Sequence, residues 1–257
     1  MIAGIFHQGS GLGNQLHRYI TVRTLAEDKG YSWGMLNPEN FKGKSFMQNL
    51  QLPEIGTMIP ARWWNEKETR ENGVDVRSYD PEVNFTGDNI VIDGEFQDER
   101  YWGHRLSDIR KWLWVEPLKV DDDLCVIGFR GGEYSLFPDL FLTREYWDRA
   151  TSMFTPKINF EVHTDDPVMA RQFFPSFPVV DNKQISHSLH TNMGLNWRAM
   201  RFAKDAIIAN SSFYILPRLL KHFEDPAAVT IAPRYWGRRN TKVWALPQNY
   251  YKKFTYI

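Results

Sequence analysis

The sequence has little cysteine, no surplus of either charge and no long hydrophobic run. Its 257 residues include 31 Lys and Arg against 31 Asp and Glu, so the formal net charge is zero. This balance disfavours a dedicated nucleic-acid-binding protein, whose phosphate contacts need a basic surplus. The single cysteine, Cys125, excludes an intrachain disulfide framework and suits a reducing compartment. No run approaches the ~18 apolar residues that span a membrane, so we expect no such span.

What is present is typical of a globular protein. Hydrophobic residues make up 42% and charged residues 24% of the chain. The amino-terminal segment lacks the pattern of a signal peptide. We therefore expect a soluble, cytoplasmic protein with one large domain or two small ones.

Short apolar runs alternate with amphipathic segments along the chain. The expected strands are residues 2–7, 31–36, 89–93, 124–129, 158–163, 177–180, 206–209 and 229–232. The expected helices are residues 14–29, 98–114, 143–154, 166–174, 196–204 and 212–223. Gly30 is expected to cap the first helix. Strands that alternate with helices predict an α/β fold with parallel sheets, and residues 37–86 receive no assignment.

A break near residues 116–123 predicts two domains, 1–120 and 121–257. Two smaller α/β halves would face a cleft, where the ligands of such folds bind.

The first expected strand runs into a glycine-rich segment, residues 9–16, here called the glycine loop, and then into a helix. Glycines let the backbone approach a ligand, and a helix N-terminus offers unpaired N–H groups to an anion. The loop departs from the dinucleotide-binding pattern, because Asn14 replaces the third glycine and the next strand ends in Asn37 rather than an acidic residue. A tight turn without a ligand is the alternative.

Polar residues follow four of the expected strands. Arg130 comes after residues 124–129. Its planar guanidinium suits a diphosphate leaving group, whose negative charge grows during the reaction. The alternative is a surface ion pair. Two further groups have two interpretations each, contact with a ligand or a cap of the following helix: Asp165–Asp166 and Asn210–Ser212. Asp98 and Glu99 follow residues 89–93, where they also favour a helix dipole.

Taken in order, these segments resemble the motifs of glycosyltransferase family 11, the bacterial α-1,2-fucosyltransferases. Residues 11–16 resemble the opening motif and residues 93–101 the G-Y-F-Q-S-E-K-Y segment. Residues 128–134 resemble H-x-R-R-G-D-Y, with Gly128, Gly131 and Glu133 in place of the histidine, second arginine and aspartate. Residues 160–166 resemble the family's F-S-D-D segment, and residues 206–213 resemble its I-I-A-N-S-S-F segment. Residues 231–236 resemble the closing P-x-x-W. After residue 213 the family continues S-W-W, where this chain has Tyr214-Ile215-Leu216.

The resemblance implies a GT-B-like α/β fold, two Rossmann-like domains facing a cleft. Residues 1–120 would be the acceptor-side domain and residues 121–257 the nucleotide-sugar-binding domain. The implied reaction is inverting, metal-independent transfer of L-fucose from GDP-fucose to a glycan hydroxyl, the 2-OH of a galactoside. A GDP-sugar donor and a glycan acceptor would be its partners, with no cofactor. Transfer from another GDP-sugar, or a glycan- or nucleotide-binding module without turnover, are the alternatives.

The resemblance also implies roles for single residues. Arg130 would stabilise the departing β-phosphate in place of a metal ion. Glu133 would remove the acceptor proton, with Asp98 or Glu99 as alternatives and Gln97 beside them. The expected donor-binding residues are Gly11, Gly13, Asn14, Gln15, Asp165, Asp166, Asn210, Ser211, Ser212 and Phe213.

Two patterns that suggest metal sites are interpreted otherwise. Asp121-Asp122-Asp123 precedes a strand, at the wrong end for a ligand crevice, and is expected to be a solvated turn. His187 and His190 have no cysteine or carboxylate partner nearby and are expected to be a surface pair.

Overall fold

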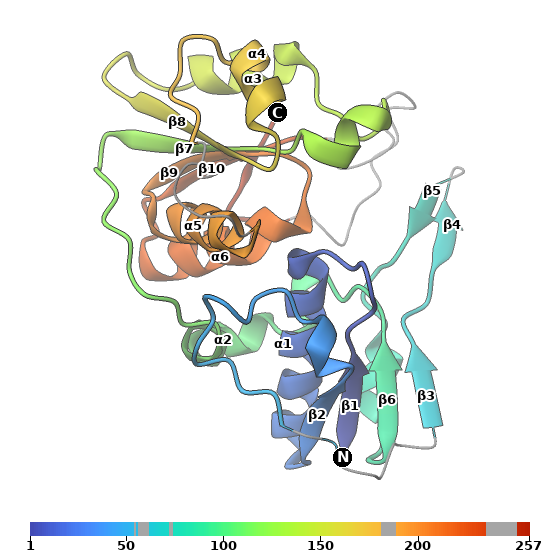
Figure 1. The fold of residues 1–257 in the computed structure, drawn as a ribbon. Coiled ribbons are helices and arrows are strands. Elements are labelled where there is room, and N and C mark those ends of the chain that lie inside the picture. Colours follow the sequence, from blue (N-terminus) through green and yellow to red (C-terminus); the bar gives the residue numbers. More distant parts are fainter. Residues whose placement is uncertain (54, 56–61, 72–73, 181–188, 235–250) are drawn as a thin grey trace. The chain divides into compact units, whose positions relative to one another are not determined.

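The computed structural model describes residues 1–53, 55, 62–71, 74–180, 189–234 and 251–257. The chain divides into two compact units, the first containing Met1–Trp114 and the second beginning at Val115. The boundary expected after residue 120 falls in the same linker, shortly before the first strand of the second unit. Each unit is an α/β layer structure built on a parallel sheet (Figure 1).

The first unit has a four-stranded sheet in the order β2-β1-β6-β3, and each of its pairings is parallel. Its strands are β1 (Ile2–Ile5), β2 (Trp33–Leu36), β3 (Arg62–Asn65) and β6 (Ile90–Asp93). A short antiparallel ribbon, β4 (Thr69–Glu71) with β5 (Val74–Val76), lies in the segment left unassigned from sequence. The same segment holds the 3-10 turns η1 (Pro38–Asn40) and η2 (Pro81–Phe85).

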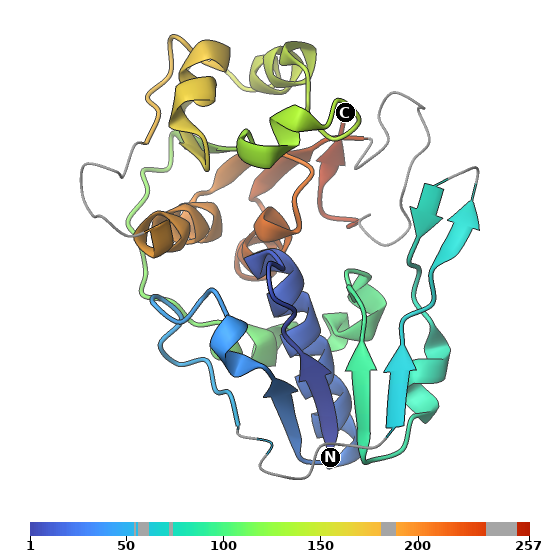
Figure 2. The ribbon, with the colours of Figure 1, turned by 45° about the vertical axis from the view of Figure 1, so that its right-hand side comes forward.

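Helix α1 (Leu12–Lys29) packs against this sheet (Figure 2). Gly4 of β1 permits the close approach, since a Cβ atom there would lie 2.5 Å from Cγ2 of Val22. The helix starts two residues before the predicted Asn14 and ends, as predicted, at Gly30, whose φ of 67° is left-handed. A glycine adopts this conformation at little cost, and its N–H caps the last turn.

The helix predicted over residues 98–114 is wrong. The chain forms two 3-10 turns, η3 (Glu99–Tyr101) and η4 (Gly103–Arg105), before the short helix α2 (Leu106–Trp112). Trp102 interrupts the helical backbone with φ −144° and ψ −9°. Its side chain is fully buried, and its indole N–H donates to the carbonyl of Phe96 at 2.9 Å. Tertiary burial of this ring overrides the helical periodicity of the segment.

The second unit has a five-stranded, all-parallel sheet in the order β11-β10-β9-β7-β8. Its strands are β7 (Leu124–Phe129), β8 (Asn159–Thr164), β9 (Asp205–Ile208), β10 (Val229–Ala232) and β11 (Thr255–Tyr256). Its helical elements are η5 (Gly132–Leu136), α3 (Arg144–Ser152), α4 (Pro167–Phe173), α5 (Leu189–Phe202) and α6 (Ser212–Glu224). Buried apolar strands in a sheet covered by helices are typical of α/β folds.

Two elements of this unit differ from the expectation. Residues 177–180 form a single bridge, between Val162 and Val179, instead of a strand. Pro178 lacks an N–H group, so the pairing cannot extend through it. Helix α5 begins at Leu189, before the predicted residue 196, and ends at Phe202.

Candidate functional site

The carboxyl edge of the second sheet brings together three of the sequence motifs. Strand β7 lies between β8 and β9, so the residues that follow these three strands are neighbours. Arg130 follows β7, Asp165 follows β8, and Asn210 follows β9. Parallel strands explain the gathering, because their carboxyl ends meet at one edge of the sheet.

Arg130 is the charged centre of this edge. Its Nη1 lies 2.5 Å from an Asp165 oxygen, and its Nη2 donates to Glu133 at 2.9 Å. The guanidinium carbon lies 5.2 Å from the ring centroid of Tyr134. The Nε atom is buried and has no hydrogen-bond partner among the described residues. One N–H donor of this cation is therefore unused.

Asp165 is held from two sides. Besides Arg130, it accepts a hydrogen bond from the backbone N–H of Gly131 at 3.0 Å. Burial raises the pKa of the Asp165 carboxyl above its usual range, against the opposing effects of Arg130 and the Gly131 N–H. The carboxylate fixes both the arginine and the loop that carries it.

Glycines allow the β7 loop to lie against the β8 loop. A Cβ atom at Gly131 would lie 2.8 Å from the Cβ of Asp166, and one at Gly132 would lie 2.5 Å from Oδ2 of Asp165. Gly128 is packed in the same way, since a Cβ atom there would lie 2.7 Å from Cε1 of Tyr214. The Tyr214 ring thus occupies the space that any side chain at position 128 would need.

The other predicted donor-binding residues of this unit include helix caps. Asp166 accepts from the N–H of Met169 at 3.0 Å and caps α4, while Ser211 accepts from the N–H of Phe213 at 3.4 Å and caps α6. Asn210 is buried and donates to the carbonyl of Leu140 at 2.9 Å. Ser212 is the first residue of α6. Their contact with a donor stays a prediction.

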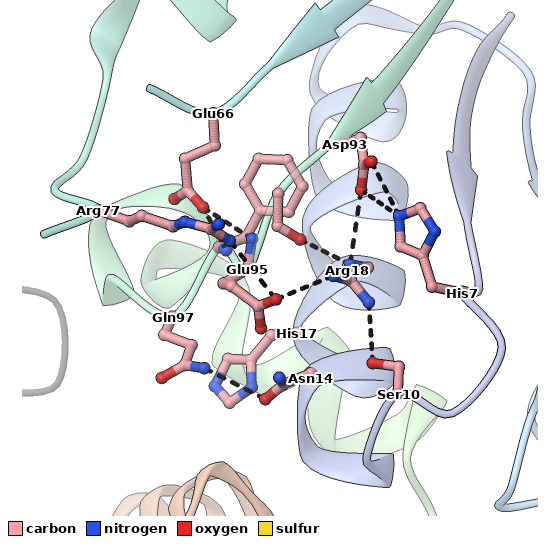
Figure 3. Close-up of polar contacts among 12 residues, drawn as sticks. His7, Ser10, Asn14, His17, Arg18, Glu66, Arg77, Asp93, Glu95 and Gln97 are labelled. Carbon is pink, nitrogen blue, oxygen red and sulfur yellow. Dashed lines mark hydrogen bonds and ion pairs between the residues drawn. The ribbon is translucent and has the colours of Figure 1, made fainter. Parts of the chain in front are cut away.

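A second polar cluster occupies the carboxyl edge of the first unit's sheet, and Figure 3 shows it around Arg18. The Arg18 guanidinium is buried and donates to the carbonyl of Gly94 at 2.6 Å, to Oγ of Ser10 at 3.0 Å and to Glu95 at 3.0 Å. Asp93 lies 3.7 Å from its Nε. The arginine thereby joins α1, the glycine loop and the end of β6.

Two of the predicted residues meet in this cluster. Gln97 donates to the side-chain oxygen of Asn14 at 3.2 Å, which joins the first turn of α1 to the segment after β6 (Figure 3). Gly11 precedes the first turn of α1, and the carbonyl of Gly13 accepts from Nδ1 of His17 at 2.8 Å. Burial lowers the pKa of His17 to about 4.

Gln15 and Asp98 form hydrogen bonds within the first unit, and their contact with a donor or acceptor stays a prediction. Gln15 is fully buried; its amide donates to the carbonyl of Asn40 at 2.8 Å and accepts from the N–H of Lys42 at 3.0 Å. Asp98 is 4% exposed and accepts from the backbone and guanidinium of Arg100 and from the backbone N–H of Tyr79. Glu99 begins the turn η3.

Sequence reasoning missed His7, Arg18 and Glu95. His7 donates from Nε2 to the carboxylate of Asp93, 86 positions away. Glu95 pairs with Arg18 and with Arg77, at 3.0 and 3.5 Å. The available signal was Arg18 itself, a charged residue between the apolar positions Leu16 and Tyr19 of an amphipathic helix.

In the described part of the chain, no group of three or more His, Cys, Asp or Glu side chains could hold a metal ion. Asp121 and Asp123 lie at the amino end of β7, where Asp123 accepts from the side chain of Asn159 at 3.1 Å. His187, Tyr235 and Trp236 lie outside the described residues. Among the helices that the structure describes, none has the length and hydrophobicity to cross a membrane.

Comparison with known proteins identifies the type of fold. No protein-family model and no curated protein sequence matches the chain. The heptosyltransferase WaaC of E. coli, solved with ADP, aligns with a TM-score of 0.52 at 12% identity, covering 100% of this chain and 92% of that one. The fold is GT-B-like. The fucosyltransferase NodZ from Bradyrhizobium aligns with a TM-score of 0.43 at 12% identity, covering 85% of this chain and 93% of that one.

Proposed function

We propose that the chain is a glycosyltransferase that moves a sugar from a nucleotide donor to a hydroxyl group. The observation that carries the proposal is Arg130, an arginine held by Asp165 at the carboxyl edge of a parallel sheet. The GT-B-like fold supports it, and so does WaaC, a glycosyltransferase of similar fold described with ADP. In this proposal the second unit holds the nucleotide.

The groups at this edge suit a diphosphate that leaves with negative charge. The Arg130 fork offers bidentate hydrogen bonds, and the N-terminus of α6 at Ser212 adds the positive end of the helix dipole. Such preorganised donors stabilise charge that develops in the transition state. Arg130 would therefore perform the task that a metal ion performs in other transferases.

The finer proposal is GDP-fucose as donor and the 2-OH of a galactoside as acceptor, with inversion at the sugar carbon. Its support is the resemblance of the motifs, above all residues 206–213. Gly128 and Gly131 depart from the family motif at the same edge, so another GDP-sugar is the second candidate. A binding module without turnover is the third.

Calorimetric titration of the purified chain with GDP-, UDP- and ADP-sugars tests the nucleotide and the sugar together. We expect binding of GDP-fucose, and loss of that binding in Arg130→Ala. Arg144→Ala is the matched control, because Arg144 belongs to the same unit and its bonds to described residues go to the carbonyls of Gln172 and Phe173. Absence of binding to every nucleotide sugar would contradict the proposal.

Turnover separates the enzyme from the binding module. The products of an incubation with GDP-fucose and lactose are analysed for free GDP and fucosylated lactose. Release of both supports the transferase. Tight GDP-fucose binding with neither product would favour the module.

A further inference from the structure

A histidine–aspartate pair lies at the carboxyl edge of the first unit's sheet. His7 follows β1, and Asp93 is the last residue of β6, the strand that pairs with β1. Nε2 of His7 lies 3.0 and 2.8 Å from the two carboxylate oxygens of Asp93 (Figure 3). Two neighbouring strands therefore set the geometry of the pair.

The carboxylate determines which ring nitrogen carries the proton. An ionised carboxylate only accepts hydrogen bonds, so Nε2 of the neutral ring bears the hydrogen and Nδ1 keeps its lone pair. No described residue forms a hydrogen bond with Nδ1, and the His7 side chain is 43% exposed. The pair thus presents a basic nitrogen whose ring is held in place.

Asp93 is in turn fixed by buried groups. The Arg18 guanidinium, 7% exposed, lies 3.7 Å from one carboxylate oxygen and binds the carbonyl of the adjoining Gly94. Ser10 and Glu95 hold the other two nitrogens of the guanidinium. The ion pair of Arg18 with Asp93 therefore fixes the carboxylate that orients the His7 imidazole.

Two of the carboxylates predicted for proton removal are already engaged. Glu133 accepts a hydrogen bond from Arg130, and Asp98 is buried beneath donors from Arg100 and Tyr79. A general base needs an accessible lone pair that can reach the reacting proton. His7 supplies an accessible lone pair at Nδ1, on a side chain that is 43% exposed.

We propose that His7 is the catalytic base and Asp93 its positioning residue in the glycosyl transfer proposed above, on which this inference rests. The acceptor oxygen attacks the anomeric carbon, and its proton moves to Nδ1 of His7. The bond between that carbon and the phosphate oxygen breaks, and its electron pair stays on the phosphate. GDP leaves as an anion, and His7 returns the proton to solvent.

The test compares three variants in transfer from GDP-fucose to lactose. His7→Gln should lower kcat by roughly 10²–10⁴-fold, the usual worth of a general base, with little change in GDP affinity. Asp93→Asn should lower kcat less, since the base is still present. His104→Gln is the matched control: Nε2 of His104 lies 2.7 Å from Asp28, also in an exposed pair, but at the far end of α1. It should leave kcat unchanged.

Added imidazole distinguishes catalysis from folding. Free imidazole should restore part of the activity of His7→Ala, which a purely structural loss would not allow. The result that overturns the inference is a His7→Gln enzyme with kcat within about threefold of wild type. A large loss in Glu133→Gln beside that result would assign the base to Glu133. A wild-type chain that neither binds GDP nor transfers sugar would instead contradict the proposed function, and with it the role of His7 as base.

Discussion

At the scale of single residues, the contacts of Arg130 require a guanidinium. Its two terminal nitrogens point to two different carboxylates, Asp165 and Glu133. Lysine keeps the charge but lacks the planar fork that spans them. Arg130→Lys should therefore cost roughly 2–4 kcal/mol of transition-state stabilisation, measured as the loss of kcat/KM for transfer.

Arg144→Lys serves as the control for this substitution, because that side chain is exposed and, within the described part of the chain, donates to backbone carbonyls. It should retain the wild-type kcat/KM. Equal activity of Arg130→Lys and wild type would mean that residues 128–134 do not correspond to the family motif.

His17 should make the first unit less stable in acid. The ring is fully buried, and burial lowers its pKa from 6.5 to about 4. The unfolded chain therefore binds more protons between these values, so stability decreases as the pH falls through this window. The loss attributable to His17 is on the order of 3 kcal/mol by pH 4.

Urea unfolding at pH 7 and at pH 4.5 measures this loss, with His17→Gln as the variant. Glutamine does not titrate, so the difference in free energy of unfolding between pH 7 and pH 4.5 should be smaller in His17→Gln than in wild type. The same pH dependence in wild type and His17→Gln would contradict the assignment.

At the scale of elements, strand β7 and helix α6 fit together only because residue 128 has no side chain. The Tyr214 ring lies over Gly128, and its hydroxyl donates to the carbonyl of Phe129 at 3.3 Å. Gly128→Ala should lower the free energy of unfolding by about 1–3 kcal/mol, since a buried ring cannot easily move aside. Urea unfolding monitored by circular dichroism measures the change.

A double-mutant cycle identifies the cause. In a Tyr214→Leu background the same Gly128→Ala change should cost less, because the smaller side chain vacates the space. An unchanged cost would place the strain elsewhere, at Met200, whose Cε also lies 2.9 Å from the added atom.

Elements with strong local signals were predictable from sequence. Gly30 ends α1 because a left-handed residue is needed there, and β7 and β10 match their predicted bounds because continuous apolar runs mark buried strands. The segment after Asp98 was not predictable in this way. Its structure depends on where Trp102 is buried, and periodicity carries no information on that.

At the scale of the whole molecule, the two sheets differ in how far the sequence reveals their polar edges. In the second unit the motif residues follow the strands directly, so the parallel topology alone brings Arg130 and Asp165 together. In the first unit the contacts of Arg18 and His7 join positions 77 and 86 residues apart. No local pattern encodes such pairs, because they depend on strand order.

The source of positive charge at the second sheet decides how the molecule responds to chelation. Arg130 and the N-terminus of α6 supply that charge in the proposed reaction, and the acidic run Asp121–Asp123 lies at the opposite, amino end of β7. Transferase activity should therefore persist at full rate in EDTA, measured as GDP release with donor and acceptor saturating. Loss of activity in EDTA and its return with Mn²⁺ would remove Arg130 as the group that stabilises the leaving phosphate, since a metal ion would then supply the charge.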